Sequence, residues 1–132
     1  MTVTIYRTTS CPSARKAELW LNRHKIKHNI RNINKNPLSK DEIIKLVSFC
    51  DNGFFDLISK KSETFTQVNK KYHFENLTFS EAVSVIYCNQ KLLRKPIIFD
   101  DKNILIGYND DLIRTFIPRS NRNIKLQDQN NY

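Results

Sequence analysis

The N-terminal third of the chain shows a strand pattern, then a helical one, then a second strand. Val3-Thr4-Ile5-Tyr6 is a β-branched and aromatic run typical of a strand. After a polar turn, Pro12 suits the first position of a helix. Side chains then recur at the helical spacing i, i+3, i+4 and i+7, namely Ala17, Trp20, Leu21 and His24. With a second strand predicted over residues 28–33, this opening is a strand–helix–strand unit, which pairs its strands in parallel.

The middle of the chain is predicted to be helical. Residues 39–42 and 78–81 both have the capping-box pattern, in which Ser or Thr precedes Glu by three residues. Apolar helical stripes follow: Ile43, Leu46, Val47 and Cys50 after the first box, and Phe79, Ala82, Val83 and Ile86 within the second helix. We expect the first helix to end before residues 51–53, where Asn or Gly suits a left-handed cap. Residues 54–71 are predicted to form two short helical pieces, split near 59–62.

The C-terminal part returns to a strand pattern. Residues 96–99 and 104–107 are apolar runs separated by a polar turn, which predicts a β-hairpin. Asn109 suits the cap of a last helix that ends at Pro118, and Leu112, Ile113 and Phe116 are expected to dock it. The order β-α-β … β-β-α predicts one α/β domain over residues 1–118. It has a helical insertion at about residues 39–90, and residues 119–132 form a polar tail.

Composition narrows the class of protein. The chain has 132 residues, 39% of them hydrophobic and 27% charged, which suits one domain with one core. No apolar run approaches the roughly 20 residues that cross a bilayer. The N-terminus lacks the basic start and apolar stretch of a signal peptide. We therefore expect a cytoplasmic protein without a membrane association.

The charge is strongly positive, +9 by formal count. Between residues 11 and 35 there is one acid, Glu18. The cations of that segment are Arg15, Lys16, Arg23, Lys25, Lys27, Arg31 and Lys35. Such a distribution is typical of a surface that binds nucleic acid or an acidic protein. A solvated helix face explains it equally well, so both interpretations stay open.

Cys11 is the strongest candidate for chemistry. It lies at the predicted start of the first helix, where the helix dipole and free backbone N–H groups favour a thiolate, and Arg15 lies one turn further on. Ala14 stands where a thiol-disulfide enzyme usually has its second cysteine, so a local disulfide is impossible, whereas sulfenic acid or a mixed disulfide is available. Cys50 and Cys88 lie on or beside apolar helix faces and are predicted to pack in the core.

Neither a disulfide framework nor a metal site is indicated. Three widely spaced cysteines are an odd number, and no Cys/His pair has the spacing of a zinc site. The three histidines do not cluster in the sequence either. We expect no metal and no cofactor.

Several short segments, in this order and spacing, resemble the arsenate reductase/Spx family over roughly residues 3–126. The first group is Tyr6, Ser10-Cys11, Arg15-Lys16-Ala17, Arg31-Asn32-Ile33, Pro37-Leu38-Ser39 and Asp41-Glu42-Ile43. The second is Gly53, Ile58-Ser59, 92–98, Gly107-Tyr108-Asn109-Asp110 and Phe116-Ile117-Pro118-Arg119. The sequence is most similar to the Spx side of that family. The resemblance implies a thioredoxin-like fold with a helical insertion, in agreement with the element order above.

The resemblance also implies a function. Spx proteins are transcriptional regulators that bind the C-terminal domain of the RNA polymerase α subunit and alter promoter choice under thiol stress. By this resemblance, Gly53 with Asn52 and Phe54 forms the polymerase-binding site. Basic residues would contact promoter DNA within that complex, and we expect the free chain to be a monomer. Position 53 also suits a plain helix C-cap, and both interpretations stay open.

The same resemblance bears on Cys11. In thioredoxin-like folds the residue matching Pro96 is usually cis and faces the active cysteine, so Arg94 or Lys95 is expected near Cys11, where it would modulate a redox-sensitive thiol. Two departures matter. Ala14 replaces the second thiol of the usual Cys-x-x-Cys switch, and Ser48 stands where Spx proteins often carry a basic residue.

The alternative is a glutaredoxin-dependent, arsenate reductase-like thiol oxidoreductase that uses Cys11. Such enzymes share the Cys11-x-x-x-Arg15 pattern, but they surround the cysteine with arginines that hold a doubly charged oxyanion in bidentate fashion. At the matching places this chain has Lys95, Gly107-Tyr108 and Ser59-Lys60-Lys61. We therefore predict a regulator and not an enzyme.

Overall fold

A four-stranded mixed sheet forms the centre of the structure. The structure is a computed structural model that describes residues 2–118, so the predicted tail at 119–132 lies outside the described residues. The strands are β1 (Val3–Arg7), β2 (His28–Asn32), β3 (Ile97–Phe99) and β4 (Ile104–Ile106). They lie in the order β2-β1-β3-β4. β1 pairs with β2 in parallel and with β3 antiparallel, and β4 completes the hairpin with β3. The predicted strands and hairpin are confirmed.

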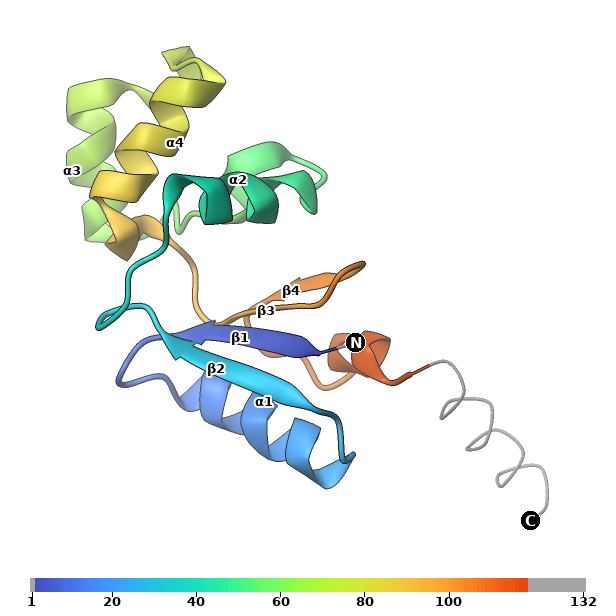
Figure 1. Cartoon of the computed structure of the whole chain (residues 1–132). Helices are drawn as coiled ribbons and strands as arrows, with labels where there is room; N and C mark the ends of the chain where they lie inside the picture. The colour runs from blue at the N-terminus through green and yellow to red at the C-terminus, as the bar shows by residue number, and fades with distance from the viewer. Residues whose placement is uncertain (1, 119–132) are drawn as a thin grey trace.

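Helices cover both faces of this sheet (Figure 1). The helix α1 (Pro12–Arg23) lies along one face. The insertion between β2 and β3 lies over the other face and contains α2 (Lys40–Ser48), α3 (Glu63–Tyr72) and α4 (Phe79–Cys88). Short 3-10 helices connect these elements: η1 (Gly53–Asp56), η2 (Phe74–Asn76) and η3 (Gln90–Leu92), with η4 (Leu112–Phe116) following the sheet. The described residues thus form a three-layer structure, and the predicted α/β class with a helical insertion is confirmed.

Alternation along the strands divides the core into two clusters. Val3, Ile5 and Ile98 pack with α1 and η4 on one face of the sheet. Tyr6 and Ile97, their neighbours in sequence, pack with the insertion on the other face. Successive side chains of a strand point to opposite faces, so β1, β3 and β4 each contribute to both clusters, whereas no residue of β2 belongs to either. The two faces of the sheet thus follow from the backbone geometry of the strands, which were predicted from their β-branched and apolar runs.

Two apolar residues lie outside the positions predicted for them. Phe79 is 48% exposed because it is the first residue of α4 and the buried stripe begins one turn later, at Ala82. Leu112 is 59% exposed, because the last helix is a 3-10 helix. In a 3-10 helix residues i and i+3 share a face, which buries Ile113 and Phe116 and leaves Leu112 outside. The N-cap of this helix is Asp111 and not Asn109 as predicted, although the Asn109 side chain accepts hydrogen bonds from the backbone N–H groups of Asp111 and Leu112.

The insertion is joined to the sheet at α2. Ser39 and Glu42 form the predicted capping box, and the Glu42 carboxylate also accepts a hydrogen bond from Arg31 of β2 and one from the Tyr6 hydroxyl at 3.4 Å. Nearby, the Gln90 amide of η3 bonds both the N–H and the C=O of Leu38, at 2.9 and 2.7 Å. These contacts connect the beginning and the end of the insertion to each other and to β1 and β2.

Among residues 2–118, no helix is both long and apolar enough to cross a membrane.

Acid is expected to weaken the contact at Glu42. Burial by itself would raise the pKa of this carboxyl, but hydrogen bonds from the Ser39 backbone and from Arg31 outweigh burial and lower the pKa. The stabilisation is therefore present above the ordinary carboxyl pKa and is lost as pH falls through the lower folded pKa. We expect Glu42→Gln to reduce the free energy of unfolding by about 0.5–1 kcal/mol at pH 7 and by much less near pH 3, measured by urea unfolding.

Glu81 offers the matched control for this prediction. It completes the second capping box, with Thr78, but the ion pairs within residues 2–118 do not include it. Glu81→Gln should therefore show the smaller change in unfolding free energy between pH 7 and pH 3. Equal pH dependence in the two variants would contradict a role for Arg31 in holding Glu42 ionised.

Candidate functional site

Cys11 lies at the N-terminus of α1, as predicted. It is the N-cap residue, with φ −143° and ψ 90°, and its side chain makes no capping hydrogen bond. Pro12 takes the first helical position, and the Arg15 N–H donates to the Cys11 carbonyl at 3.2 Å. The residue is half-buried and its thiol is free. Arg15, itself exposed, lies one turn further along the helix.

The segment before β3 approaches the same end of the sheet. The Lys95–Pro96 peptide bond is cis, as the family resemblance implied. Tyr6 pairs with Ile97, so Pro96 lies where β1 ends and the chain turns toward Cys11. The carbonyl of Pro96 accepts from the N–H of Gly107 at 2.8 Å.

The side chains of Arg94 and Lys95 line hollows on the insertion side. The isolated bridge between Ile58 and Leu93 joins this segment to the residues that follow η1, and the Arg94 N–H donates to the Leu57 carbonyl at 2.7 Å. Arg94 borders a hollow with Cys50 and Asp56, and Lys95 borders another with Gln90. Cys11 is not among the described residues that line either hollow. A role for these two cations beside Cys11 therefore stays a prediction.

Gly53 begins η1 and has a left-handed backbone, with φ +66°. The C-cap of α2 is Phe49, four residues earlier, so the interpretation of Gly53 as a plain cap of that helix is wrong. A Cβ at this position would have no heavy atom beyond its chain neighbours within 4 Å, among the residues that the structure describes. The left-handed backbone therefore explains why residue 53 is a glycine, because no crowding within the chain requires it. The space beside Gly53 is open.

The carboxylate of Asp56 holds this loop in place. It accepts hydrogen bonds from the backbone N–H of Asn52 at 3.0 Å and from the Asn52 side-chain amide at 3.2 Å. Sequence reasoning missed Asp56, although its i, i+4 spacing from Asn52 is a signal that can be read from the chain. We call residues 52–56 the Gly53 loop.

The three residues predicted for the polymerase contact differ in exposure. Asn52 is exposed and Gly53 is half-buried. Phe54 is half-buried against the insertion core, with its ring 5.0 Å from that of Phe55 and 6.4 Å from that of Phe74. Phe54 thus anchors the loop, and Asn52 and Gly53 form its accessible part.

The two remaining cysteines lie in different environments. Cys50 packs against the insertion core, as predicted, and its thiol donates to the Leu46 carbonyl at 3.4 Å. Burial, with smaller contributions from Asp56 and Asp51, raises the pKa of Cys50 to about 11, so this thiol stays protonated at neutral pH.

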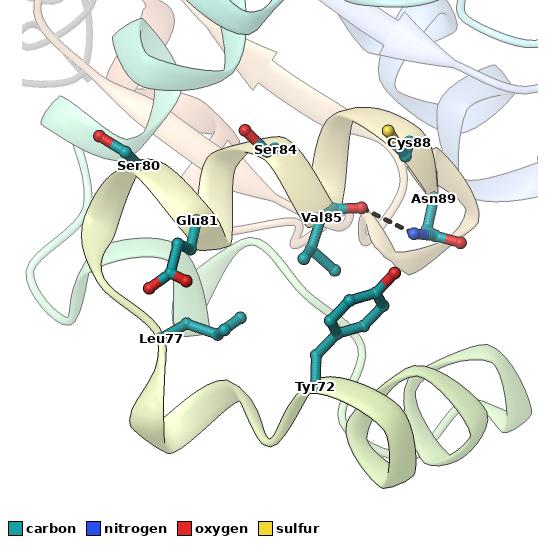
Figure 2. Close-up of a pocket in the computed structure, with 8 residues that line it drawn as sticks. All are labelled: Tyr72, Leu77, Ser80, Glu81, Ser84, Val85, Cys88 and Asn89. Carbon is teal, nitrogen blue, oxygen red and sulfur yellow. Dashed lines mark hydrogen bonds between the residues drawn. The ribbon is translucent and has the colours of Figure 1, made fainter.

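Cys88 does not pack in the core, contrary to the prediction. It is the last residue of α4 and is exposed. Figure 2 shows it one turn beyond Ser84, at the edge of a hollow of about 400 Å³ between α4 and the end of α3. Tyr72 and Leu77 form the opposite wall of that hollow.

The sheet order, the cysteine at the start of α1 and the cis proline before β3 define a thioredoxin-like protein. The family model described as the ArsC family matches residues 6–116. The Streptococcus mutans protein named Global transcriptional regulator Spx is 42% identical over 125 residues, which are 95% of this chain and 90% of that protein. The chain therefore belongs to the ArsC family, and within it to the Spx group.

Solved structures support the fold. An ArsC family related protein from Bacteroides fragilis matches with a TM-score of 0.74 at 16% identity, covering 88% of this chain and 98% of that one. An arsenate reductase from Vibrio cholerae matches with a TM-score of 0.71 at 17% identity, covering 89% and 96%. At these identities the likeness extends to the fold alone, because one fold hosts many functions. The predicted family and fold are confirmed.

Proposed function

We propose that the chain is a transcriptional regulator that binds the C-terminal domain of the RNA polymerase α subunit through the Gly53 loop. The name of its Streptococcus mutans relative, at 42% identity over most of both chains, supports the regulatory role. The observation that carries the binding site is the open space beside the left-handed Gly53. Because glycine has no side chain, a partner's backbone or side chain can approach the loop at position 53 more closely than it could if any other residue stood there.

The loop is also held ready for binding. Asp56 holds Asn52 by two hydrogen bonds, and Phe54 packs into the insertion core. A loop that is already ordered loses less conformational entropy when it binds, so more of the contact energy is retained as affinity. The exposed Asn52 amide then supplies a polar contact at the edge of such an interface.

The enzyme alternative has one observation in its favour, the free, half-buried Cys11 at a helix N-terminus on a fold shared with an arsenate reductase. Reduction of a doubly charged oxyanion needs permanently charged, bidentate donors around the thiol. Arg15 is the cation that α1 places nearest in sequence to Cys11, and Arg94 borders a hollow with Cys50 and Asp56. The arrangement is therefore better suited to a redox-sensitive thiol than to an oxyanion reductase.

A pull-down of the purified chain with the C-terminal domain of the α subunit tests the proposal. We expect the wild type and Cys11→Ser to bind equally, within about twofold, because α1 and the Gly53 loop lie on opposite sides of the sheet (Figure 1). Absence of binding by the wild type would contradict the regulator. Glutaredoxin-coupled arsenate turnover that disappears in Cys11→Ser would support the enzyme instead.

A further inference from the structure

The strand β2 forms an open edge of the sheet. It is the first strand in the order β2-β1-β3-β4, so β1 lies on one side of it and no strand of the described chain lies on the other (Figure 1). The strand at the opposite edge, β4, has three residues, whereas β2 has five. A longer edge strand presents a row of backbone groups to which another strand can pair.

The hydrogen bonds to β1 show which backbone groups of β2 face outward. The Val3 N–H donates to the Lys27 carbonyl at 3.2 Å, and the Ile33 N–H donates to the Arg7 carbonyl at 2.8 Å. In a parallel pair, every second residue of a strand bonds the neighbouring strand. The odd-numbered residues of this segment therefore bond β1, and the even-numbered residues direct their N–H and C=O groups away from the sheet.

The outward-facing residues are His28, Ile30 and Asn32. No loop or side chain among residues 2–118 bonds the backbone of His28 or Ile30. The Asn32 carbonyl accepts from the N–H groups of Lys35 and Asn36, at 3.2 and 3.0 Å, so the open row ends there. The edge thus offers a continuous set of backbone donors and acceptors from His28 to the N–H of Asn32.

Features that usually block such an edge are missing from β2. Its sequence, His-Asn-Ile-Arg-Asn, has no proline and no lysine. Arg31, its one permanently charged residue, bonds Glu42 and the Pro37 carbonyl, so its guanidinium is held toward the insertion. In the middle of the strand, Ile30 is 49% exposed, although its partner in register, Ile5, is buried. Ile30 therefore offers an apolar contact to a neighbouring strand on the open side.

The charge around β2 indicates an acidic partner. Between Glu18 and Asp41 the chain has no acidic residue. Lys25 and Lys27 are exposed just before the strand, and Lys35 is exposed just after it. Glu18 is itself paired with an arginine of β1, so it does not compensate these lysines.

We propose that β2 binds an extended segment of an acidic partner protein, which pairs with the open edge as a fifth strand of the sheet. The backbone of β2 bonds the main chain of this segment, Ile30 packs against one of its apolar side chains, and the flanking lysines attract its carboxylates. Nucleic acid does not carry the alternating N–H and C=O groups that a strand edge pairs with, so the edge favours a peptide among polyanions.

A second copy of the chain fits this edge less well. Pairing of two β2 strands would bring two lysine-rich segments together, and like charges that face each other across a strand pair are destabilising. The site is also separate from the Gly53 loop, which lies in the insertion. The proposal therefore goes beyond the proposed function and does not depend on it.

Amide hydrogen exchange, followed residue by residue by NMR, locates the contact. The probe is a ten-residue peptide of alternating glutamate and valine, added to the full chain. In the free chain the amides of Asn29 and Arg31 should exchange slowly, because they bond β1. The amides of His28 and Ile30 should exchange fast, and saturating peptide should slow them by at least about tenfold.

The affinity of the same peptide, labelled with fluorescein and measured by anisotropy, separates strand pairing from charge. A version N-methylated at every residue keeps its carboxylates but loses its N–H donors, so it should bind at least about tenfold more weakly. Ile30→Pro removes one outward N–H and leaves the bonds to β1 in place, so it should weaken binding by at least about fivefold without a change in net charge.

The contribution of the lysines is measured with a charge-matched pair of variants. Lys27→Gln/Lys35→Gln should bind the peptide roughly threefold to tenfold more weakly, because both lysines flank the edge. Lys70→Gln/Lys71→Gln changes the last turn of α3 and should stay within about twofold of the wild type.

Equal affinity for the N-methylated and the unmodified peptide would overturn the proposal, because charge alone would then explain binding. Protection confined to amides outside residues 28–32 would overturn it as well. If circular dichroism shows that Ile30→Pro does not fold, the N-methylated peptide still decides the question on the wild type. Wild-type dimers in sedimentation that disappear in Ile30→Pro would assign the edge to a second copy and would contradict the choice of partner.

Discussion

Gly53→Arg is expected to abolish binding to the C-terminal domain of the α subunit, with an affinity loss of at least about 100-fold. The long side chain would fill the open space beside residue 53, where we propose that the partner approaches. An arginine side chain in a closely packed interface would clash with the partner and keep the two surfaces apart. Substitutions at such central interface positions typically reduce the binding free energy by more than about 2 kcal/mol. The measurement is a titration of the labelled α-subunit domain with the wild type and with the variant.

Backbone strain must be separated from this effect. An L-residue in the left-handed region costs about 1–2 kcal/mol, so Gly53→Arg also lowers the stability of the chain. Gly107 offers a matched control, since its φ is +81° and a Cβ there would likewise meet nothing within 4 Å among the described residues. Gly107→Arg should lose similar stability in urea unfolding and should keep binding the partner.

Gly53→Asn provides the complementary control. Asn tolerates the left-handed conformation better than other residues and is much shorter than Arg. This variant is expected to bind more weakly than the wild type, yet far more tightly than Gly53→Arg. If Gly107→Arg reduced binding as much as Gly53→Arg, strain or charge would explain the loss, and the Gly53 loop would not be the contact.

Phe74→Ala is expected to have the largest effect on stability. Phe74 lies in η2, between α3 and α4, and is 1% exposed. Its ring stacks on that of Phe65 at 5.6 Å and lies 6.4 Å from that of Phe54. Removing a buried phenyl ring costs about 3–5 kcal/mol through lost burial and the cavity that remains. Because a domain of this size has about 5–15 kcal/mol in total, a large part of the stability would be lost.

The same substitution is expected to affect the binding site. Phe54 belongs to the Gly53 loop and packs into the cluster that contains Phe74. A cavity at residue 74 would loosen this anchor, so partner binding should weaken even at temperatures where the variant remains folded. Phe74→Leu, which keeps a large apolar side chain, should cost about 1.5 kcal/mol or less and should retain binding. Urea unfolding followed by circular dichroism checks both variants, and a loss below about 1 kcal/mol in Phe74→Ala would contradict this role.

Local patterns in the sequence predicted the elements of the fold with few errors. Both capping boxes form as predicted, at Ser39 and Thr78, because each depends on residues only three positions apart. The strands follow from runs of β-branched, aromatic and apolar residues, and the position of Cys11 follows from Pro12 at the first helical turn. Interactions within one turn of a helix or along one strand are encoded in neighbouring residues, so the chain can be read directly for them.

The candidate site was only partly predictable for the same reason. The left-handed conformation of Gly53 was expected from the residue type, but its separation from the α2 C-cap was not. Cys88 lies on an apolar helical pattern and is nevertheless exposed. The pattern does not show how far along a helix the elements that pack against it extend. Arg94 or Lys95 was expected near Cys11, and this stays a prediction. The structure adds a contact that no local pattern connects, between the Arg94 N–H and the carbonyl of Leu57, 37 positions away.

The sequence by itself thus determined the order of elements, the family and the place of Cys11. Tertiary structure alone decided which surfaces are free. It showed Glu18 of α1 bound to Arg7 of β1, and the Gly53 loop held by Asp56 with open space beside the glycine. Periodicity is a property of the local backbone, whereas exposure depends on which distant segments pack together, and those contacts form between residues that no local pattern connects.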